Sequence, residues 1–188
     1  MRKLIVFNHV SLDGYFQDVR GDMSWAHTND PDPEWNAFVE SNAKGGGVLV
    51  FGRITYELMT RYWPTEMARQ NDPVVAGRMN AMPKVVFSRT LKTATWNNTR
   101  LIADDPVTAM RRLKDEDGDD MAMFGSGTIV AQLAPAGLID EYQIVVNPLI
   151  LGSGRTMFEG IAEPLRLRQT RVRAFQNGNV VLWYAPAY

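Results

Sequence analysis

The sequence contains no cysteine and only two histidines, His9 and His27, in 188 residues. Without cysteine the chain has no disulfide, no thiolate nucleophile and no thiolate metal ligand. Two histidines in separate segments exclude the H-E-x-x-H motif and multi-histidine zinc sites. A serine hydrolase would have to use one of these histidines, and the sequence has no G-x-S-x-G elbow. The commonest hydrolase and zinc-enzyme classes are therefore excluded.

The chain also lacks an excess of charge and a long apolar run. Twenty Lys and Arg residues oppose 21 Asp and Glu residues, so no overall field attracts nucleic acid or an anionic membrane. The apolar N-terminal run is short and contains Asn8 and His9, which argues against a signal peptide or a membrane span. We therefore expect a cytoplasmic protein with no nucleic-acid or membrane partner, and a single domain over residues 1–188.

Apolar strand patterns alternate with helical patterns along the chain, and the pattern ends in a hairpin signal. Residues 165–175 and 180–184 flank Asn177-Gly178, a dipeptide typical of a primed hairpin turn. Alternating strands and helices followed by an antiparallel end predict an α/β fold, with a mainly parallel sheet and an antiparallel C-terminal hairpin. We expect strands at 3–10, 48–51, 84–90, 101–103, 121–124 and 138–147, and helices beginning at Asp32-Pro33, Gly52, Asn71 and Asp105-Pro106.

The stretch Met121–Leu133, MAMFGSGTIVAQL, joins an apolar strand to a helix through Gly125-Ser126-Gly127. Two positions without side chains let backbone N–H groups approach an anion, and a helix start adds partial positive charge. The stretch lacks the third glycine of G-x-G-x-x-G and the lysine of a P-loop. It predicts either a ligand cradle or a plain strand-to-helix corner. The residues that would contact the ligand are Phe124, Gly125, Ser126, Gly127, Thr128 and Ile129.

Two other apolar strands end in similar groups. Gly52-Arg53-Ile54-Thr55 follows residues 48–51, and Ser88-Arg89 follows Phe87. Arg53 lies at the positive end of a helix, where an acid is preferred, so a bound anion would relieve the conflict. Alternatively, Arg53 reaches a surface carboxylate such as Glu57. A hydroxyl beside a guanidinium, as in Ser88-Arg89, suits a phosphate monoester.

These three strand ends favour a phosphorylated dinucleotide. In open α/β sheets, ligands bind at the carboxyl ends of the strands. A pyrophosphate on the glycine turn and a 2′-phosphate near Arg53, Thr55, Ser88 and Arg89 would use every one of these groups. This arrangement predicts NADPH rather than NADH as the cofactor.

Two carboxylates and one loop are further candidates. Glu34 lies in the first turn of a helix and would raise the basicity of a substrate or relay a proton, or would only stabilise its helix. Asp13 is either catalytic or holds the turn before Gly14. The loop at residues 15–29 carries Phe16, Met23 and Trp25, and either closes over a pocket or caps the core.

One acidic run suggests calcium but does not fit it. In residues 115–120 the glycine is fourth, whereas an EF-hand loop needs it sixth with a glutamate at position twelve. We interpret the run as a solvated turn and propose no metal.

The ordered set of these motifs resembles the dihydrofolate reductase-like superfamily, and more closely the reductase half of the bacterial bifunctional riboflavin deaminase-reductase. The resemblance implies a three-layer sandwich around a mixed, mostly parallel sheet, NADPH as hydride donor, and a homodimer. In dihydrofolate reductases the Gly-Arg-x-Thr helix start and the Ser-Arg pair hold the 2′-phosphate and adenosine, and the Gly-x-Gly helix start holds the pyrophosphate. An acid four residues before a phenylalanine is also typical there, and Glu34 precedes Phe38 by that spacing, with Asp32 as a nearby alternative. The matching motifs are Ser11-Leu12-Asp13-Gly14, residues 52–57, Ser88-Arg89, residues 124–127, 138–141 and 148–152.

The resemblance implies hydride transfer from NADPH to a C=N or C=O bond of a small heterocyclic or ribosylaminopyrimidine-like substrate, in riboflavin or folate-type metabolism. The pterin-binding context of dihydrofolate reductases is not recognisable in this chain. Two other classes are considered: a non-catalytic NADP(H)-binding or sensing protein of the same fold, and a structural domain whose turns bind nothing. The apolar residues 144–151 also favour a homodimer.

Overall fold

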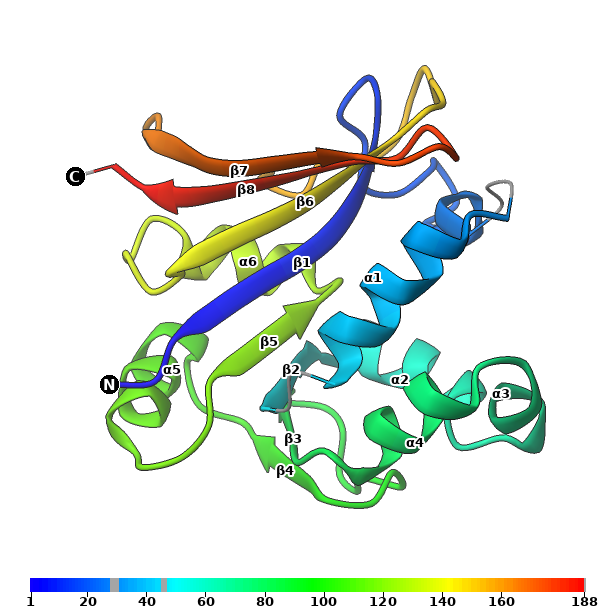
Figure 1. Cartoon of the computed structure of the whole chain (residues 1–188). Coiled ribbons are helices and arrows are strands. Elements are labelled where there is room, and N and C mark those ends of the chain that lie inside the picture. The colour runs from blue at the N-terminus through cyan, green and yellow to red at the C-terminus, as the bar shows by residue number, and fades with distance from the viewer. Residues whose placement is uncertain (28–30, 45–46, 188) are drawn as a thin grey trace.

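The computed structural model describes residues 1–27, 31–44 and 47–187, and its strands form one eight-stranded sheet (Figure 1). The strand order is β4-β3-β2-β5-β1-β6-β8-β7. The first six of these run parallel, whereas β8 is antiparallel to β6 and β7. The predicted α/β fold is confirmed. The strands are β1 (Leu4–Ser11), β2 (Val48–Gly52), β3 (Lys84–Phe87), β4 (Thr99–Ile102), β5 (Met121–Phe124), β6 (Glu141–Asn147), β7 (Leu167–Ala174) and β8 (Val180–Pro186).

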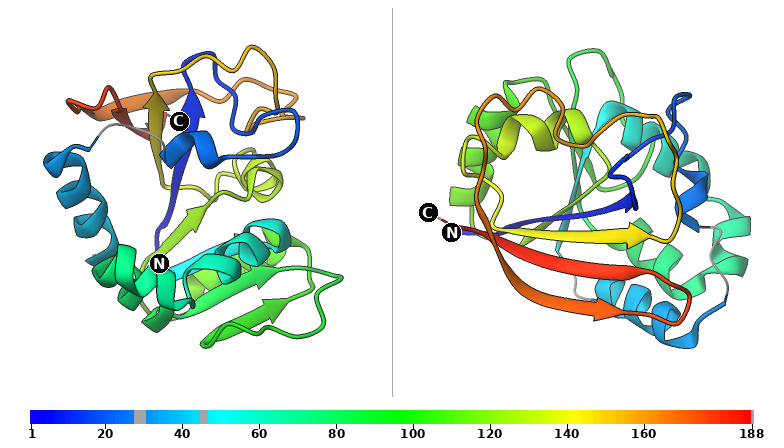
Figure 2. Two further views of the ribbon diagram at one scale, coloured as in Figure 1. Left: turned by 90° about the vertical axis from the view of Figure 1, so that its right-hand side faces the viewer. Right: turned by 90° about the horizontal axis from the view of Figure 1, so that it is seen from above.

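Helices cover both faces of this sheet (Figure 2). On one face, α5 and α6 pack on the residues of β2 and β3 that include Val50 and Val85. On the other face, α2 and α4 pack on Leu49 and Val86, and α1 packs through Phe38 on β6 and β8. The helices are η1 (Ser24–His27), α1 (Pro33–Lys44), α2 (Arg53–Tyr62), α3 (Glu66–Asn71), α4 (Pro73–Ala81), α5 (Pro106–Asp115) and α6 (Gly127–Leu133).

The two central strands are sealed on one face and partly open on the other. In β1 the even-numbered residues 4–8 are at most 2% exposed, whereas the odd-numbered residues 5–9 are half-buried. In β5, Met121 and Met123 are buried, whereas Ala122 and Phe124 are half-buried. The half-buried residues lie on the α1 and α2 side, between two separate clusters of core residues. The middle of the sheet is therefore incompletely covered on that side.

The start of α1 is as the sequence predicts, and its capping residue has a second role. Asp32 is 3% exposed, and its Oδ1 accepts hydrogen bonds from the N–H groups of Glu34 (2.9 Å) and Trp35 (3.2 Å). Its Oδ2 accepts from the N–H of Asn177 (3.2 Å) in the C-terminal hairpin. Asp32 therefore ties α1 to the hairpin. The predicted helix end near Gly45-Gly46 lies outside the described residues, as do residues 28–30.

Two predicted details of local structure are wrong. The helix predicted to begin at Asn71 begins at Pro73 instead, because Asn71 is the last residue of the short helix α3 and Asp72 precedes α4. The hairpin turn is not of the primed type. The N–H of Gly178 bonds the carbonyl of Phe175 (3.1 Å), and only Gly178 has a positive φ, of 85°. This is a three-residue loop, in which glycine supplies the one left-handed position.

None of the helices in the described part of the chain is long and apolar enough to cross a membrane. In the same residues, no group of three His, Asp or Glu side chains is placed to hold a metal ion.

Candidate functional site

The carboxyl ends of β3, β2 and β5 are neighbours at one edge of the sheet, as predicted. The helix that follows β2 packs on one face, and the helix that follows β5 packs on the other. The chain therefore turns towards one face of the sheet after β2 and towards the other face after β5. Such a switch point in an open α/β sheet forms a crevice at the carboxyl ends of the strands, which is where ligands bind in folds of this class.

The turn after β5 is held by a buried amide of the central strand. Asn8, 2% exposed, accepts a hydrogen bond from the N–H of Gly125 (2.5 Å) and donates to the carbonyl of Gly125 (3.1 Å). Gly125 and Ser126 both have a positive φ, 59° and 60°. The left-handed region costs little for glycine but is unfavourable for serine. The turn is thus a strained conformation that surrounding contacts maintain.

Those contacts join the turn to β2 and α2. The N–H of Ser126 donates to Oγ1 of Thr55 (2.9 Å), and the N–H of Gly52 donates to Oγ of Ser126 (2.8 Å). A side chain at Gly52 would lie 3.2 Å from Cγ1 of Ile129. Four predicted site residues therefore form one hydrogen-bonded and packed joint. Thr55 and Ser126 position the backbone here, a role that the sequence did not indicate.

Unused donors remain at this edge. The N–H groups of Gly127 and Thr128 have no acceptor among the described residues. Helix α2 begins after Gly52 with no side-chain cap. Arg53 forms the ion pair that was the alternative prediction, with its Nη1 2.9 Å and 3.1 Å from the carboxylate oxygens of Glu57. Both side chains are substantially exposed, so the pair contributes little to stability and can exchange for a stronger anion.

The predicted pair at the end of β3 divides into a turn residue and an exposed cation. Oγ of Ser88 accepts from the N–H groups of Thr90 (3.2 Å) and Leu91 (2.9 Å), which shapes the loop. Arg89 is exposed. Hydrogen bonds from Thr108 lower the pKa of Asp105, and the charge of Arg89 lowers it further. Arg53 and Arg89 thus lie just past the carboxyl ends of the adjacent strands β2 and β3.

The two predicted catalytic acids lie elsewhere. Asp13 accepts from the hydroxyl of Ser11 (2.6 Å) and from the N–H groups of Leu151 (3.1 Å) and Gly152 (2.7 Å). These hydrogen bonds lower the pKa of Asp13 and clamp the turn after β1 to the loop after β6. They match the alternative in which Asp13 holds the turn.

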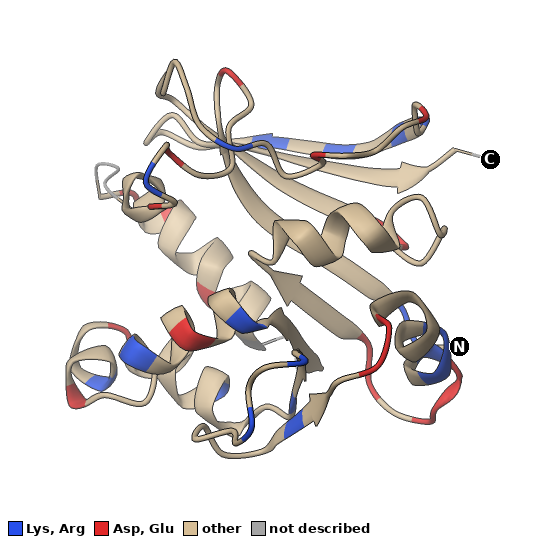
Figure 3. Ribbon diagram, turned by 180° about the vertical axis from the view of Figure 1, so that it is seen from behind, with Lys and Arg blue, Asp and Glu red and all other residues tan. Residues whose placement is uncertain are grey.

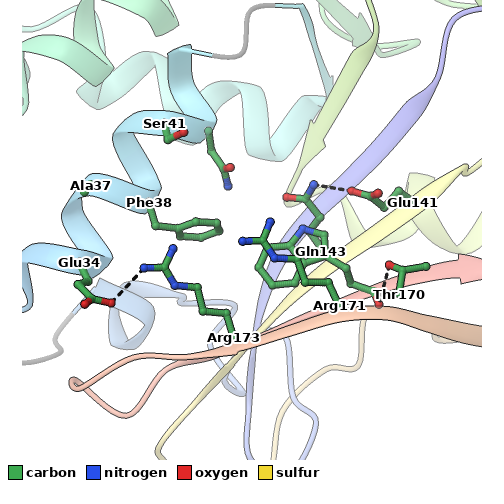
Figure 4. A pocket seen from close by; sticks show the side chains of 11 residues that line it. Glu34, Ala37, Phe38, Ser41, Glu141, Gln143, Thr170, Arg171 and Arg173 are labelled. Atoms are coloured by element: carbon green, nitrogen blue, oxygen red, sulfur yellow. Dashed lines mark hydrogen bonds and ion pairs between the residues drawn. The ribbon is translucent and has the colours of Figure 1, made fainter.

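Glu34 lines a cavity of about 790 Å³ between α1 and the strands β6, β8 and β7 (Figure 4). Its carboxylate is paired with Arg173 at 3.0 Å. Arg171 lies over the ring of Trp183 (4.6 Å). The cavity therefore combines two acids, Glu34 and Glu141, with two guanidinium groups.

A bulge in β7 explains why these arginines share a face. Arg168 pairs with Ala185 and Arg171 pairs with Trp183, and the register shifts between Gln169 and Arg171. The extra residue reverses the alternation, so Arg168, Arg171 and Arg173 all point to the α1 side. Basic residues follow one another along this strand in Figure 3. The sequence did not predict this cluster.

The loop at residues 15–29 packs on the core in its described part. Phe16 is 3% exposed and belongs to the main apolar cluster, and a side chain at Gly127 would lie 3.2 Å from its ring. The backbone at Gln17 pairs with Arg155. Arg155 in turn donates to Oγ1 of Thr128 (3.2 Å). The loop thus reaches the start of α6, which fits the interpretation that it caps the core.

Sequence reasoning missed Asn8 and Arg155. A polar amide inside an apolar strand was the available signal for Asn8, because such a group is buried only with partners. Arg155 follows the glycine-rich residues 152–154, but nothing in the sequence relates it to Thr128, which it contacts across 27 positions.

The two histidines, distant in sequence, are neighbours in space. Their ring centroids are 5.8 Å apart, and His9 also contacts Phe7 and Trp35 edge-on, at 5.7 Å and 6.0 Å. Burial lowers the pKa of His9 to about 4 and is opposed by the hydrogen bond to Asn147. Burial also lowers the pKa of His27. Both rings are therefore neutral in the native state at pH 7.

We expect acid to weaken the fold through His9. Between pH 6.5 and 4 the unfolded chain binds a proton at this residue and the folded chain does not, so the free energy of unfolding falls as the pH falls. The loss is about 3.5 kcal/mol at about 1.4 kcal/mol per unit, and it is complete below pH 4. Urea unfolding at pH 7, 6, 5 and 4 measures it. The variant His9→Asn should lose most of the pH dependence of the free energy of unfolding, and the part that remains comes from His27, which contributes in the same direction. The same pH dependence in the variant and the wild type would contradict the assignment.

Residues 2–181 match the RibD C-terminal domain family, so the chain belongs to this family. Two Bacillus subtilis relatives, the uncharacterized proteins YyaP and YwjB, are 25% and 24% identical to it over 183 and 179 residues. These alignments cover 97% and 93% of this chain and 94% and 92% of the relatives.

Solved structures share the fold. A putative riboflavin biosynthesis protein from Shewanella sp. PV-4 superposes with a TM-score of 0.77 at 23% identity, covering 99% of each chain. A diaminohydroxyphosphoribosylaminopyrimidine deaminase/5-amino-6-(5-phosphoribosylamino)uracil reductase from Thermotoga maritima gives 0.68 at 17% identity. That match covers 99% of this chain and 57% of the Thermotoga chain. The predicted resemblance to the reductase half of the bifunctional enzyme is confirmed.

Proposed function

We propose that this protein is an NADPH-dependent reductase that transfers a hydride to a C=N or C=O bond of a small heterocyclic substrate, of the ribosylaminopyrimidine type. The observation that carries the proposal is the sheet edge where β3, β2 and β5 end side by side, with Arg89 after β3, Arg53 after β2 and the glycine turn after β5. Family membership supports an oxidoreductase. The substrate class is suggested by the Thermotoga relative, which is named as a phosphoribosylaminouracil reductase.

The residues at the crevice fit such a cofactor. A dinucleotide phosphate needs cations and unused N–H donors, and the crevice offers Arg89, Arg53, the N–H groups of Gly127 and Thr128, and the uncapped start of α2. Ser88 and Thr55 accept hydrogen bonds through their oxygens, so each hydroxyl proton can still be donated to a phosphate. We assign the 2′-phosphate to Arg53, Thr55, Ser88 and Arg89, and the pyrophosphate to residues 124–129.

In this proposal NADPH supplies the hydride, and the chain orients the reactants and excludes water. Asn8 fixes the backbone of Gly125, and Thr55 fixes that of Ser126, so the crevice is shaped before the cofactor binds. The half-buried rings of Phe7 and Phe124, edge-to-face at 5.8 Å, form an apolar floor beside the turn. Glu34, paired with Arg173 at the rim of the α1 cavity, would hold or relay a proton through water.

The variants Arg89→Ala and Arg53→Ala test the cofactor assignment. Each charge-assisted contact to the 2′-phosphate contributes about 1.5–3 kcal/mol, less where solvent screens it, so NADPH binding should weaken by roughly ten- to a hundredfold. NADH, which lacks this phosphate, should bind almost unchanged. Quenching of tryptophan fluorescence measures both affinities, because the chain has five tryptophans.

Arg69→Ala is the matched control, since Arg69 forms an exposed pair with Glu66 at 3.2 Å and lies on α3. Equal losses for NADPH and NADH would exclude the proposed phosphate site. A wild-type protein whose fluorescence does not respond to NADPH would refute the function as a whole.

A second function is favoured by one observation, namely that several carboxylates near the site are already used structurally. Asp13 clamps two loops and Asp32 caps α1, so both of these carboxylates hold the backbone. A non-catalytic NADP(H)-binding or sensing protein would have this arrangement. Stopped-flow measurement of hydride transfer to pterins and ribosylaminopyrimidines separates the two functions.

We also propose a homodimer. The predicted contact through residues 144–151 has less support, because half of them lie in β6, which is paired on both sides with β1 and β8. The edge strand β7, exposed along nearly its whole length, offers a more accessible surface.

A further inference from the structure

His9 lies next to the proposed cofactor crevice but has no part in holding the cofactor. The pairing of β1 with β5 ends at Phe7 and Phe124, and β1 continues to Ser11. Asn8 faces the glycine turn, so His9 lies on the opposite face, on the incompletely covered side of the sheet. The side chain is therefore close to the turn and half-buried on the α1 side.

The hydrogen bonds around His9 determine which ring nitrogen is free. Asn147 is fully buried, and its Nδ2 donates to the carbonyl of Ala26 (3.3 Å). Its Oδ1 therefore faces Nδ1 of His9, at 2.9 Å. An amide oxygen only accepts, so Nδ1 carries the proton. In a neutral ring this leaves Nε2 with its lone pair, and Nε2 has no partner among the residues that the structure describes.

The surroundings of the His9 ring are aromatic, and the imidazole of His27 also lies beside it, with the ring centroids 5.8 Å apart. Phe7 and Trp35 contact the ring of His9 edge-on, and Phe124 contacts Phe7. His9 and these three aromatic residues are half-buried. Aromatic walls beside the free Nε2 acceptor of His9 suit a flat, uncharged heterocycle that bears an N–H group, because the rings pack on its faces and the acceptor selects its edge.

We propose that His9, oriented by Asn147, recognises the substrate ring, with Nε2 accepting a hydrogen bond from a ring N–H of a pyrimidine-type heterocycle. This inference rests on the proposed function for its substrate class. It adds a specificity-determining residue. It also predicts weak binding of rings whose edge facing Nε2 of His9 presents only acceptors or an alkyl group.

Two substitutions at His9 separate recognition from a structural role. In His9→Asn the amide N–H can replace Nδ1 and keep the bond to Asn147, but nothing replaces Nε2. In His9→Gln the amide oxygen can replace Nε2, but the bond to Asn147 is lost. A structural role predicts that His9→Asn is the milder change, whereas recognition predicts that His9→Gln is the milder one for ligand binding.

The experiment is calorimetric titration with 6-aminouracil and its 1,3-dimethyl derivative, with and without NADP⁺. We expect the wild type to bind 6-aminouracil better than the dimethyl compound. His9→Asn should weaken 6-aminouracil binding by roughly three- to tenfold, the effect of one hydrogen bond, and should bring the ratio of the two affinities close to one. His9→Gln should keep most of the ratio.

Unchanged preference in His9→Asn would overturn the inference, and so would a wild type that binds neither compound. Binding of NADPH is read separately by fluorescence. A protein that selects 6-aminouracil through His9 but does not bind NADPH would support this inference while refuting the proposed reductase. Both variants should bind NADPH like the wild type.

Discussion

Replacing Gly125 by alanine is expected to destabilise the fold by about 2–5 kcal/mol and to abolish NADPH binding. Gly125 has a φ of 59°, and a Cβ atom there would lie 2.7 Å from both Cγ2 and Oγ1 of Thr55. The left-handed backbone costs about 1–2 kcal/mol for alanine. Relieving the contact moves Thr55, which breaks its bond to Ser126 and costs roughly 1–3 kcal/mol.

Gly160→Ala is the matched control for this substitution. Gly160 also has a positive φ, of 87°, but an added Cβ would contact nothing within 4 Å. The variant Gly160→Ala should therefore lose only the stability that the left-handed backbone costs an alanine, and it should still bind NADPH. Urea unfolding and fluorescence titration of both variants measure the difference. Equal destabilisation in the two would show that the contact with Thr55 is unimportant.

Asp140→Ala is expected to cost about 3–4 kcal/mol of stability. Lys114 is 5% exposed, and its ammonium group bonds Oδ2 of Asp140 and the carbonyl of Leu138. The same carboxylate oxygen accepts from the N–H of Leu4 (2.7 Å) at the start of β1. Removing it leaves a buried cation without its counter-charge and a strand donor without its acceptor. The loss falls in the lower part of the range for buried pairs because Asp140 is 38% exposed.

Glu66→Ala provides the comparison on the surface. Glu66 and Arg69 are 70% and 56% exposed, so breaking their pair should change stability by less than about 1 kcal/mol. Denaturant midpoints at pH 7 test both predictions. If Asp140→Ala were as mild as Glu66→Ala, water would have to reach Lys114 in the native state.

The order of elements and the edge of the sheet that carries the site could be predicted from the sequence. Apolar runs that end at Gly52, Phe87 and Gly125 mark parallel strands, and the carboxyl ends of such strands share one edge. The N-cap at Asp32 was equally readable, because an acid before proline and glutamate is a local signal. Each of these features depends on residues that are close in sequence.

Features that depend on distant partners were missed or misjudged. Asn177-Gly178 favours a primed turn locally, but the hairpin has one more loop residue, and Gly178 packs so closely on Pro148 that an added Cβ would lie 2.8 Å from its Cγ. Thr55 reads as a phosphate ligand in sequence and proves to hold Ser126. The β7 arginines share one face of the strand because of a bulge, and no residue type in the sequence indicates that bulge.

The joint at the glycine turn has a consequence for how this protein acquires its activity. Asn8 and Gly125 are 117 positions apart, Thr55 and Ser126 are 71 apart, and Gly52 and Ser126 are 74 apart. Contacts of such long range form late, after the loops between them have closed. In a partly folded chain, the segments that form the crevice are therefore present but are not yet assembled. A ligand at this edge would bind only the native state. It would therefore shift the folding equilibrium towards the native state without increasing the rate of folding.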